Sequence, residues 1–284
     1  GQLNPMKGGL LCADILNTVS ERYSKEIQTA EYGCGLEAVL QSRKEDLYGV
    51  LNGIDYDIWS PSSDADIARN YDYETIDGKK DCKEALQKTL GLSVRGEIPL
   101  ISMVSRLDPG KGFDILAEGV HDIMKLDVQF ALLGTGRPQY HEMFENIASE
   151  YYRRMSVNLK FDAKLARQIY AGADIFLMPS RYEPCGLGQM ISLAYGTIPI
   201  VRSVGGLADT ISDFDPESGT GNGFVFKEYS AEQLVSQVKK AVETFKNREV
   251  WGKLIKNAMD SDFSWDVSAR QYVELYKKAV AKYT

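Results

Sequence analysis

The middle of the chain alternates between short apolar runs and longer segments whose apolar positions recur at helical spacing. The apolar runs, which we expect to be buried strands, cover residues 100–104, 128–133, 175–178 and 198–201. The segments expected to be helices cover residues 113–124, 140–151, 165–170, 187–195 and 231–245. Continuously apolar strands that alternate with helices are typical of a parallel sheet covered on both faces. We therefore predict a doubly wound α/β fold with its ligand crevice beyond the carboxyl ends of the strands.

The two ends of the chain follow this pattern less regularly. Residues 14–19 and 47–51 are plausible strands of the same fold. Residues 64–83 are polar and predict a surface loop that leads into a helix. Residues 266–283 carry apolar side chains partly on one face and predict a terminal helix. With 284 residues, the chain is long enough for one large α/β domain or two small ones.

Acidic residues outnumber basic ones, and the formal net charge is -7. A surface of this sign repels nucleic acids and anionic membranes as a whole. An anionic ligand must then be held by a local group of cations, which favours a small phosphate-bearing ligand over a nucleic acid. No apolar run approaches the roughly 20 residues that span a bilayer. We therefore expect neither a nucleic acid nor a membrane as a partner.

Cysteine and histidine give no sign of a metal site. The four cysteines form no C-x-x-C pair, and the sequence holds two histidines. We expect four free thiols in a reducing compartment, and no bound metal. Asp64-Ala65-Asp66 has the spacing of a D-x-D metal motif, but it falls in the polar loop, where we expect it to be solvated.

The first candidate cluster for chemistry follows the strand expected at residues 100–104. Arg106 comes directly after this strand, and Lys111 opens the next helix across a Pro-Gly turn. Two cations at this spacing can converge on one diphosphate, and the helix N-terminus adds partial positive charge. The alternative is a solvated loop that carries two surface cations.

The second cluster, residues 179–189, follows the strand expected at residues 175–178. Its glycines stand beside a helix start, where backbone N–H groups are exposed to an anion. Glu183 lies at the strand end and could accept hydrogen bonds from sugar hydroxyls. The alternative is a glycine-rich turn with a capping carboxylate.

A third cluster, residues 205–210, follows the next strand, and its glycines would let a ligand approach the backbone. Gly134-Thr135-Gly136 also falls at a strand end. It is not the G-x-G-x-x-G fingerprint, because Gln139 occupies the last position, and this weakens a dehydrogenase interpretation. The sequence has no G-x-x-x-x-G-K-S/T string, which argues against a P-loop ATPase.

Together these clusters resemble bacterial glycogen synthases and plant starch synthases. The matching strings occur in family order: S-R-L-x-x-x-K-G from Ser105, P-S-R-Y-E-P-C-G-L from Pro179 and G-G-L-A-D-T from Gly205. E-P-C-G-L is the most discriminating of them. Other segments that resemble the family are residues 13–20, 33–36, 52–55, 59–61 and 263–265. The resemblance covers essentially the whole chain.

The resemblance implies the GT-B fold, in which two Rossmann-like domains face a deep cleft. It implies that this chain is the C-terminal half, with a Rossmann-like doubly wound parallel sheet. Residues 1–265 would form the domain that binds the nucleotide-sugar donor. Residues 266–284 would form a helix that packs toward an N-terminal domain, which we expect to be missing from the chain.

The resemblance also assigns roles to individual residues. Arg106 and Lys111 match the pair that binds the donor diphosphate, and Glu183 matches the glutamate near the donor sugar. Phe161 matches an aromatic residue that stacks on adenine; the alternative is a core phenylalanine. The other residues matched to the donor site are Gly134, Cys185, Gly186, Leu187, Gly188, Gly205, Gly206, Leu207 and Thr210. Ile191 stands where many related glycosyltransferases have a second glutamate, which fits the synthases better.

The implied activity is transfer of glucose from ADP-glucose, with retention, to the non-reducing end of an α-1,4-glucan. No metal or cofactor is implied, and the glucan acceptor would bind through the missing N-terminal domain. This chain alone would be inactive, and its location would be the cytoplasm, or a plastid in a plant. Two alternatives stay open, namely a GT-B transferase for another nucleotide sugar and a non-catalytic nucleotide-sugar-binding module.

Overall fold

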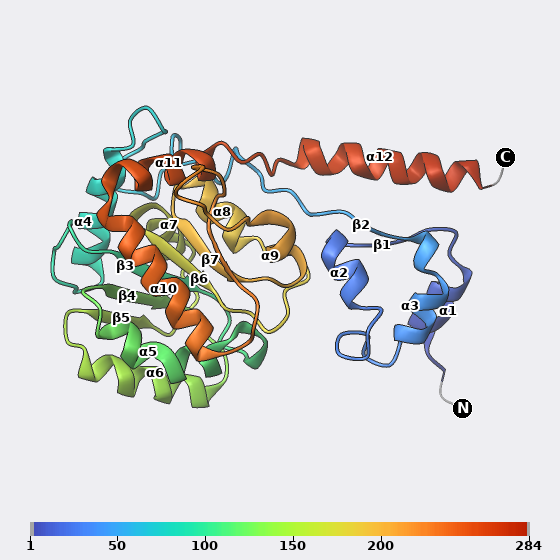
Figure 1. Cartoon of the computed structure of the whole chain (residues 1–284), viewed down its shortest axis with the longest axis horizontal. Coiled ribbons are helices and arrows are strands. Elements are labelled where there is room, and N and C mark those ends of the chain that lie inside the picture. Colours follow the sequence, from blue (N-terminus) through green and yellow to red (C-terminus); the bar gives the residue numbers. More distant parts are fainter. Residues whose placement is uncertain (1–2, 283–284) are drawn as a thin grey trace.

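A computed structural model describes residues 3–282, and its main body is a six-stranded parallel sheet (Figure 1). The strands are β3 (Leu100–Val104), β4 (Gln129–Leu133), β5 (Met155–Asn158), β6 (Ile175–Met178), β7 (Ile198–Arg202) and β8 (Phe224–Phe226). Their order is β5-β4-β3-β6-β7-β8, and every neighbouring pair is parallel. This order confirms the predicted doubly wound α/β fold.

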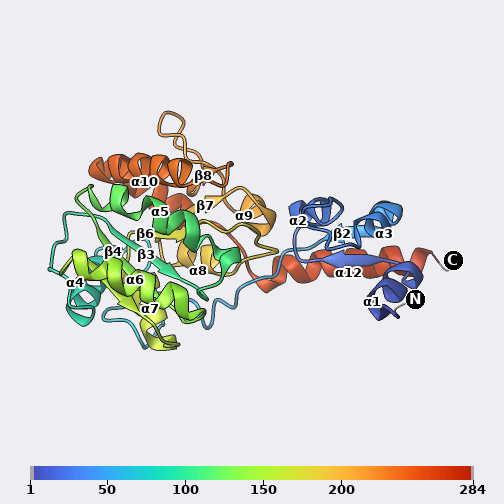
Figure 2. The same ribbon diagram turned by 90° about the horizontal axis from the view of Figure 1, so that it is seen from below.

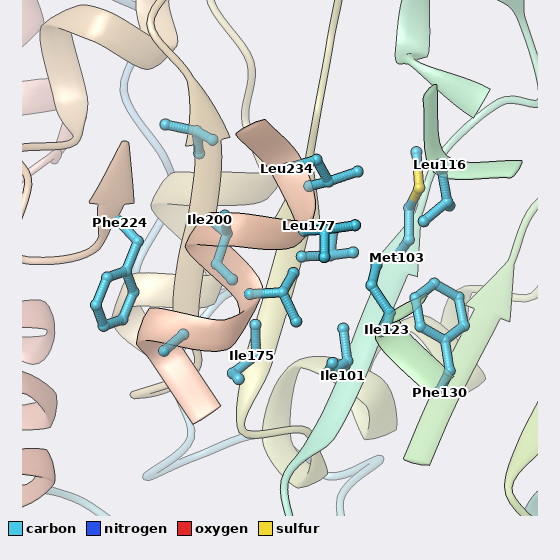
Figure 3. Packing of buried hydrophobic residues seen from close by; sticks show 14 of the residues in the cluster. Ile101, Met103, Leu116, Ile123, Phe130, Ile175, Leu177, Ile200, Phe224 and Leu234 are labelled. Atoms are coloured by element: carbon cyan, nitrogen blue, oxygen red, sulfur yellow. The ribbon is translucent and has the colours of Figure 1, made fainter. Parts of the chain in front are cut away.

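Helices cover both faces of this sheet. They are α4 (Gly78–Thr89), α5 (Phe113–Met124), α6 (Pro138–Glu150), α7 (Ala163–Gly172), α8 (Gly188–Ala194), α9 (Gly205–Thr210), α10 (Ala231–Lys246) and α11 (Arg248–Met259). Side chains alternate between the two faces along each strand, as a period of two requires. Ile101 and Met103 pack with residues of α5 and α10 (Figure 3). Leu100 packs with residues of α4 and α7.

The expected elements of this body are present, and four further elements, strands β5 and β8 and helices α9 and α11, were not predicted. Strand β6 and helix α5 have the bounds that the pattern predicted. Strand β5 is an edge strand with three half-buried residues, so it lacks the continuous apolar run that marked the central strands. Helix α11 has three buried positions, Trp251, Leu254 and Ala258, and directly follows the stronger pattern of α10.

Residues 3–50 form a smaller body beside the main one (Figure 1). It contains α1 (Pro5–Cys12), β1 (Leu16–Thr18), α2 (Glu21–Glu26), α3 (Glu37–Ser42) and β2 (Leu47–Gly49). We call it the N-terminal unit. Both predicted strands exist, but they pair in parallel with each other in a separate two-stranded sheet and not in the main sheet. Apolar runs mark a strand without indicating its partner, which explains the difference.

The chain crosses between the two bodies twice at one place. On the first crossing, the Ile54 N–H donates to the carbonyl oxygen of Phe263 at 2.8 Å. The second crossing leads into the predicted terminal helix, α12 (Trp265–Ala281), which lies along the N-terminal unit (Figure 2). There the Lys282 ammonium donates to the Asp14 carbonyl oxygen at 2.6 Å and contacts Asp46. Residues 283–284, which the predicted helix includes, lie outside the described residues.

The surface-loop prediction for residues 64–83 was wrong for three of its charged residues, Asp64, Lys79 and Lys83, which are buried. The Asp64 carboxylate accepts from the Tyr195 hydroxyl at 2.5 Å and pairs with Arg167 at 3.1 Å. It is therefore part of the packing between this segment and the main body, not a solvated D-x-D motif. Charged side chains are buried where partners satisfy them, and sequence alone did not reveal those partners.

Lys79 and Lys83 lie at the amino-terminal edge of the sheet. The Lys79 ammonium donates to the carbonyl oxygens of Ala171 at 2.9 Å and Tyr195 at 3.0 Å. These carbonyl groups lie at the C-terminal ends of α7 and α8. Lys79 also donates to the Thr197 hydroxyl at 2.6 Å. The neighbouring Lys83 pairs with Asp174 at 2.6 Å. Within residues 3–282, none of the helices has the length and apolar character needed to cross a bilayer.

Candidate functional site

The loops after β3 and β6 meet at the carboxyl edge of the sheet. From β3 the chain continues toward β4 and β5, and from β6 toward β7 and β8, so the strand order reverses between these neighbours. Ligand crevices of doubly wound sheets form at such a point. The two loops are joined there, because the Arg181 N–H donates to the Gly110 carbonyl oxygen at 2.9 Å.

An ion pair connects the first two candidate clusters across this point. The Lys111 ammonium donates to the Glu183 carboxylate at 2.5 Å, and the Ser180 hydroxyl donates to the same oxygen at 3.1 Å. The Glu183 side chain is 8% exposed, whereas that of Lys111 is 23% exposed. One of the three Lys111 donors is thus engaged by the protein. The sequence placed these residues at two strand ends, but it could not show that those strands are neighbours.

Arg106 lies at the same edge and is exposed. No residue between 3 and 282 forms a hydrogen bond or ion pair with its guanidinium group. An arginine held at a strand end with all five donors free can bind a phosphate through two of them. The structure therefore leaves Arg106 available for an anion at the edge where Lys111 also lies.

The E-P-C-G-L loop presents free backbone donors. The N–H groups of Gly186, Leu187 and Gly188 form no hydrogen bond with any described residue. Gly186 has φ of +71°, a conformation that favours glycine. Behind the loop, the buried side chain of Gln189 donates to the carbonyl oxygens of Cys185 at 3.0 Å and Gly186 at 3.1 Å. These bonds fix the loop while its N–H groups stay open to an anion.

Cys185 lies in this loop and is buried. Burial raises the pKa of its thiol, and a hydrogen bond from the backbone of Asn52 opposes that shift. A raised pKa leaves little thiolate at neutral pH, so this cysteine is poorly suited to act as a nucleophile. The prediction that the four cysteines are free thiols is confirmed.

The third cluster, in α9, lies against the second one. The Gly206 N–H donates to the Glu183 carbonyl oxygen at 3.0 Å, and a Cβ atom at Gly206 would lie 2.1 Å from the Cys185 carbonyl oxygen. Leu207 and Thr210 are buried, and the Thr210 hydroxyl donates to Gly206. These residues support the E-P-C-G-L loop from behind. Their direct contact with a donor stays a prediction.

Sequence reasoning missed a contact of this cluster with the N-terminal unit. The Glu26 carboxylate of α2 accepts from the Gly205 N–H at 3.0 and 3.2 Å. Glu26 is buried, although a glutamate on a short polar helix gave no sign of this in the sequence. The strongest available signal was the resemblance of the nearby residues 13–20 to the family.

Phe161 and Gly134 lie beside a cavity of about 230 Å³ at the ends of β3 and β4. Arg106, Thr135 and Lys160 also line this cavity. Phe161 is 89% exposed, so the alternative of a core phenylalanine is wrong. A Cβ atom at Gly134 would lie 1.8 Å from the Ser105 carbonyl oxygen, so a glycine is needed for the two loops to touch. An exposed aromatic ring beside a cavity and a free arginine suits a nucleobase joined to phosphate.

Comparison with known proteins adds independent findings. Residues 92–258 match the family model "Glycosyl transferases group 1", and residues 1–42 match "Starch synthase catalytic domain". Over 283 residues, 99% of this chain, the identity is 52% with the glycogen synthase of Pseudothermotoga lettingae and 54% with that of Thermosipho melanesiensis. The chain spans 58% and 59% of the lengths of these two relatives.

Solved structures agree with these matches. The catalytic domain of starch synthase IV from Arabidopsis thaliana is similar with a TM-score of 0.92 and 37% identity, over 98% of this chain and 58% of that one. The C-terminal domain of a group 1 glycosyl transferase from Francisella tularensis shares the fold, with a TM-score of 0.52 and 17% identity over 73% of this chain and 95% of its own. These similarities confirm the resemblance that E-P-C-G-L and its companion strings indicated, and the GT-B fold class expected from it.

Proposed function

Because the chain belongs to the group 1 glycosyl transferases, we propose that it is the donor-binding half of a glycogen or starch synthase. The whole protein would transfer glucose from ADP-glucose, with retention, to the non-reducing end of an α-1,4-glucan. The observation that carries this proposal is the Lys111–Glu183 pair beside the unpaired Arg106 and the open N–H groups of the E-P-C-G-L loop. Two cations and a carboxylate at the same edge of the sheet suit a ligand that joins a diphosphate to a sugar.

The donor would lie across the crevice in a defined direction. Its diphosphate would contact Arg106, Lys111 and the N–H groups at Gly186–Gly188, and its sugar hydroxyls would donate to Glu183. Its base would stack on Phe161 beside the cavity of about 230 Å³. The similar starch synthase IV structure is a complex with ADP and acarbose, which supports this choice of nucleotide.

The residues present could stabilise departure of the diphosphate. Negative charge grows on its oxygens as the bond to the glucose anomeric carbon breaks. Arg106, Lys111 and the fixed N–H groups would meet this charge, and a preorganised donor of this kind contributes about 3 to 4 kcal/mol to the transition state. Glu183 is held by Lys111 and Ser180, so its carboxylate would orient the sugar ring instead of moving with it.

We further propose a division of labour within the whole protein. Residues 1–265 would bind the donor, and residues 266–284 would pack toward a further domain that binds the glucan acceptor. Three exposed apolar side chains on α12 support such a neighbour: Val273, Tyr276 and Val280 are 49%, 67% and 64% exposed. The chain alone would then bind nucleotide and transfer no glucose. We place the protein in the cytoplasm, or in a plastid if its source is a plant.

Calorimetric titration of this chain with ADP, UDP and GDP tests the proposal. We expect ADP to bind in preference to the other two, and Arg106→Ala and Lys111→Ala each to weaken it at least tenfold, because each removes a charge-assisted phosphate contact worth about 1.5 to 3 kcal/mol. Lys125→Ala is the matched control, since this lysine of the same region is exposed and pairs with Asp122 at the far end of α5. Preference for UDP or GDP would show that the donor is a UDP- or GDP-sugar and not ADP-glucose. Equal binding by all variants would overturn the site.

A further inference from the structure

We propose that α9 couples the position of the N-terminal unit to the E-P-C-G-L loop, and that Glu26 and Asp209 are positioning residues for the donor site. This inference rests on the proposed function, because it assigns a role in donor binding to residues that lie outside the crevice. Three sets of contacts carry it: those between α2 and α9, those between α9 and the loop, and the burial of the groups involved.

Helices α2 and α9 each supply a carboxylate that accepts hydrogen bonds from the other helix. Glu26, at the end of α2, accepts from the N–H of Gly205, the first residue of α9. In return, Asp209 near the end of α9 accepts from the Arg22 N–H at 3.0 Å and from the Ser20 hydroxyl at 2.6 Å, both at the start of α2. Each carboxylate thus satisfies donors at the N-terminus of the other helix, where N–H groups lack partners within the helix. The contact fixes the two helices in both directions along their axes.

Helix α9 also contacts the E-P-C-G-L loop at two points. At its start, the Gly206 N–H donates to the carbonyl oxygens of Glu183 at 3.0 Å and Pro184 at 3.2 Å. At its end, the Thr210 hydroxyl accepts from Gln189 at 3.2 Å, and the same Gln189 amide donates to the loop carbonyl oxygens. A shift of α9 would therefore move the backbone of Glu183 and the open N–H groups that follow it.

There is no free space at this junction to absorb such a shift. A Cβ atom at Gly205 would lie 2.0 Å from the Glu183 carbonyl oxygen, so α9 and the loop are in backbone contact. The Glu26 side chain is 10% exposed and forms an ion pair at 2.9 Å with Arg22, whose side chain is 54% exposed. Close-packed backbones with buried hydrogen bonds move together, because a gap between them would leave polar groups unsatisfied. The Glu26 carboxylate thus reaches the loop through one residue, Gly205.

Paired measurements on the whole chain test this coupling. Glu26→Ala leaves the Gly205 N–H buried without an acceptor, and Glu26→Gln keeps an acceptor but removes the charge. We expect roughly tenfold weaker ADP binding for the alanine variant, about threefold for the glutamine variant and a similar threefold for Asp209→Asn. Amide hydrogen exchange should become faster in the same order at Ile191, whose N–H donates to the carbonyl oxygen of the loop residue Leu187 at 2.9 Å. Glu21→Gln is the control, because Glu21 is on the same helix, exposed and paired with Lys25.

The outcomes separate this inference from the proposed function. If the unmodified chain binds no ADP, the proposed function fails, and hydrogen exchange at Ile191 still tests the coupling. Faster exchange confined to α2 and α9, with Ile191 unchanged, would overturn the coupling. Tighter ADP binding by Glu26→Ala would also overturn it, since Glu26 would then compete with the donor for α9. If the alanine variant fails to fold, the glutamine variant and Asp209→Asn decide the question by the same two measurements.

Discussion

The two edges of the main sheet use the same residue type in opposite ways. At the amino edge, the buried Lys79 ammonium has four protein acceptors for its three donors. At the carboxyl edge, Lys111 is partly exposed and has Glu183 as its ion-pair partner, and Arg106 has no partner among residues 3–282. A cation whose donors are all satisfied holds the scaffold together. A cation held in place with donors to spare can bind a ligand.

The environment of Lys79 explains why its charge can be buried at all. The carbonyl oxygens that it contacts belong to the C-terminal ends of α7 and α8, where a cation is favoured and carbonyl groups lack partners. Burial acts in the other direction and is the largest of the influences that together lower the pKa of Lys79 to about 7. The amino edge thus buries a charged group at the cost of a lowered pKa, whereas the cations of the carboxyl edge are partly or largely exposed.

Lys79→Met tests the contrast between the two edges of the sheet most directly. This change removes the Lys79 hydrogen bonds to the Thr197 hydroxyl and to two helix-end carbonyl oxygens, which keep the Tyr71 hydroxyl as a donor. We therefore expect a loss of about 2 kcal/mol in the free energy of unfolding of the main body. Urea denaturation followed by circular dichroism measures it. Lys80→Met is the control, because Lys80 is exposed and pairs with Asp77. A loss below 1 kcal/mol would show that the amino edge does not depend on this lysine.

A second prediction concerns the apolar part of the carboxyl edge. Phe161→Ala removes an exposed ring that packs on no core, so its effect should fall on ligand binding and not on folding. We expect ADP binding to weaken by about 1 to 2 kcal/mol, the value of one base–aromatic stack, with the urea midpoint unchanged. Phe161→Tyr should retain binding. Equal ADP affinity of the alanine variant and the unmodified chain would place the base elsewhere.

The smallest expected effect is the pH dependence of stability that burial of Lys79 at the amino edge should cause. The ordinary pKa of lysine is 10.5, and that of Lys79 in the folded chain is lowered to about 7. Between these values the unfolded chain holds a proton that the folded chain has lost, so stability rises with pH through this window. From pH 7 to pH 8 the gain should be about 1 kcal/mol. Urea midpoints of the unmodified chain and of Lys79→Met measure it, and parallel pH dependence in both would contradict the assignment.

Sequence reasoning succeeded where a local pattern decides the structure. Strand β3, the turn around Pro109 and helix α5 follow one another in the sequence, and the positions of Arg106 and Lys111 at the sheet edge follow from them. It failed where the partner is distant in the sequence. The pairing of β1 with β2, the burial of Lys79 and the Glu26–Gly205 contact join segments separated by up to 179 residues. No local pattern encodes those contacts, because the same polar residue is equally acceptable on a surface.

The double crossing near Ile54 has a mechanical consequence. A Cβ atom at Gly53 would lie 2.5 Å from the Trp265 nitrogen, and Ile54 and Ser264 form a parallel bridge, so the two connections run as one paired ribbon. Two connections at a single place act as a hinge, because they allow the two bodies to rotate about the ribbon and resist translation along it. The reciprocal carboxylate contacts of α2 and α9 then restrict rotation about this hinge. Breaking these contacts would change the angle between the two bodies but would not move their axis of rotation.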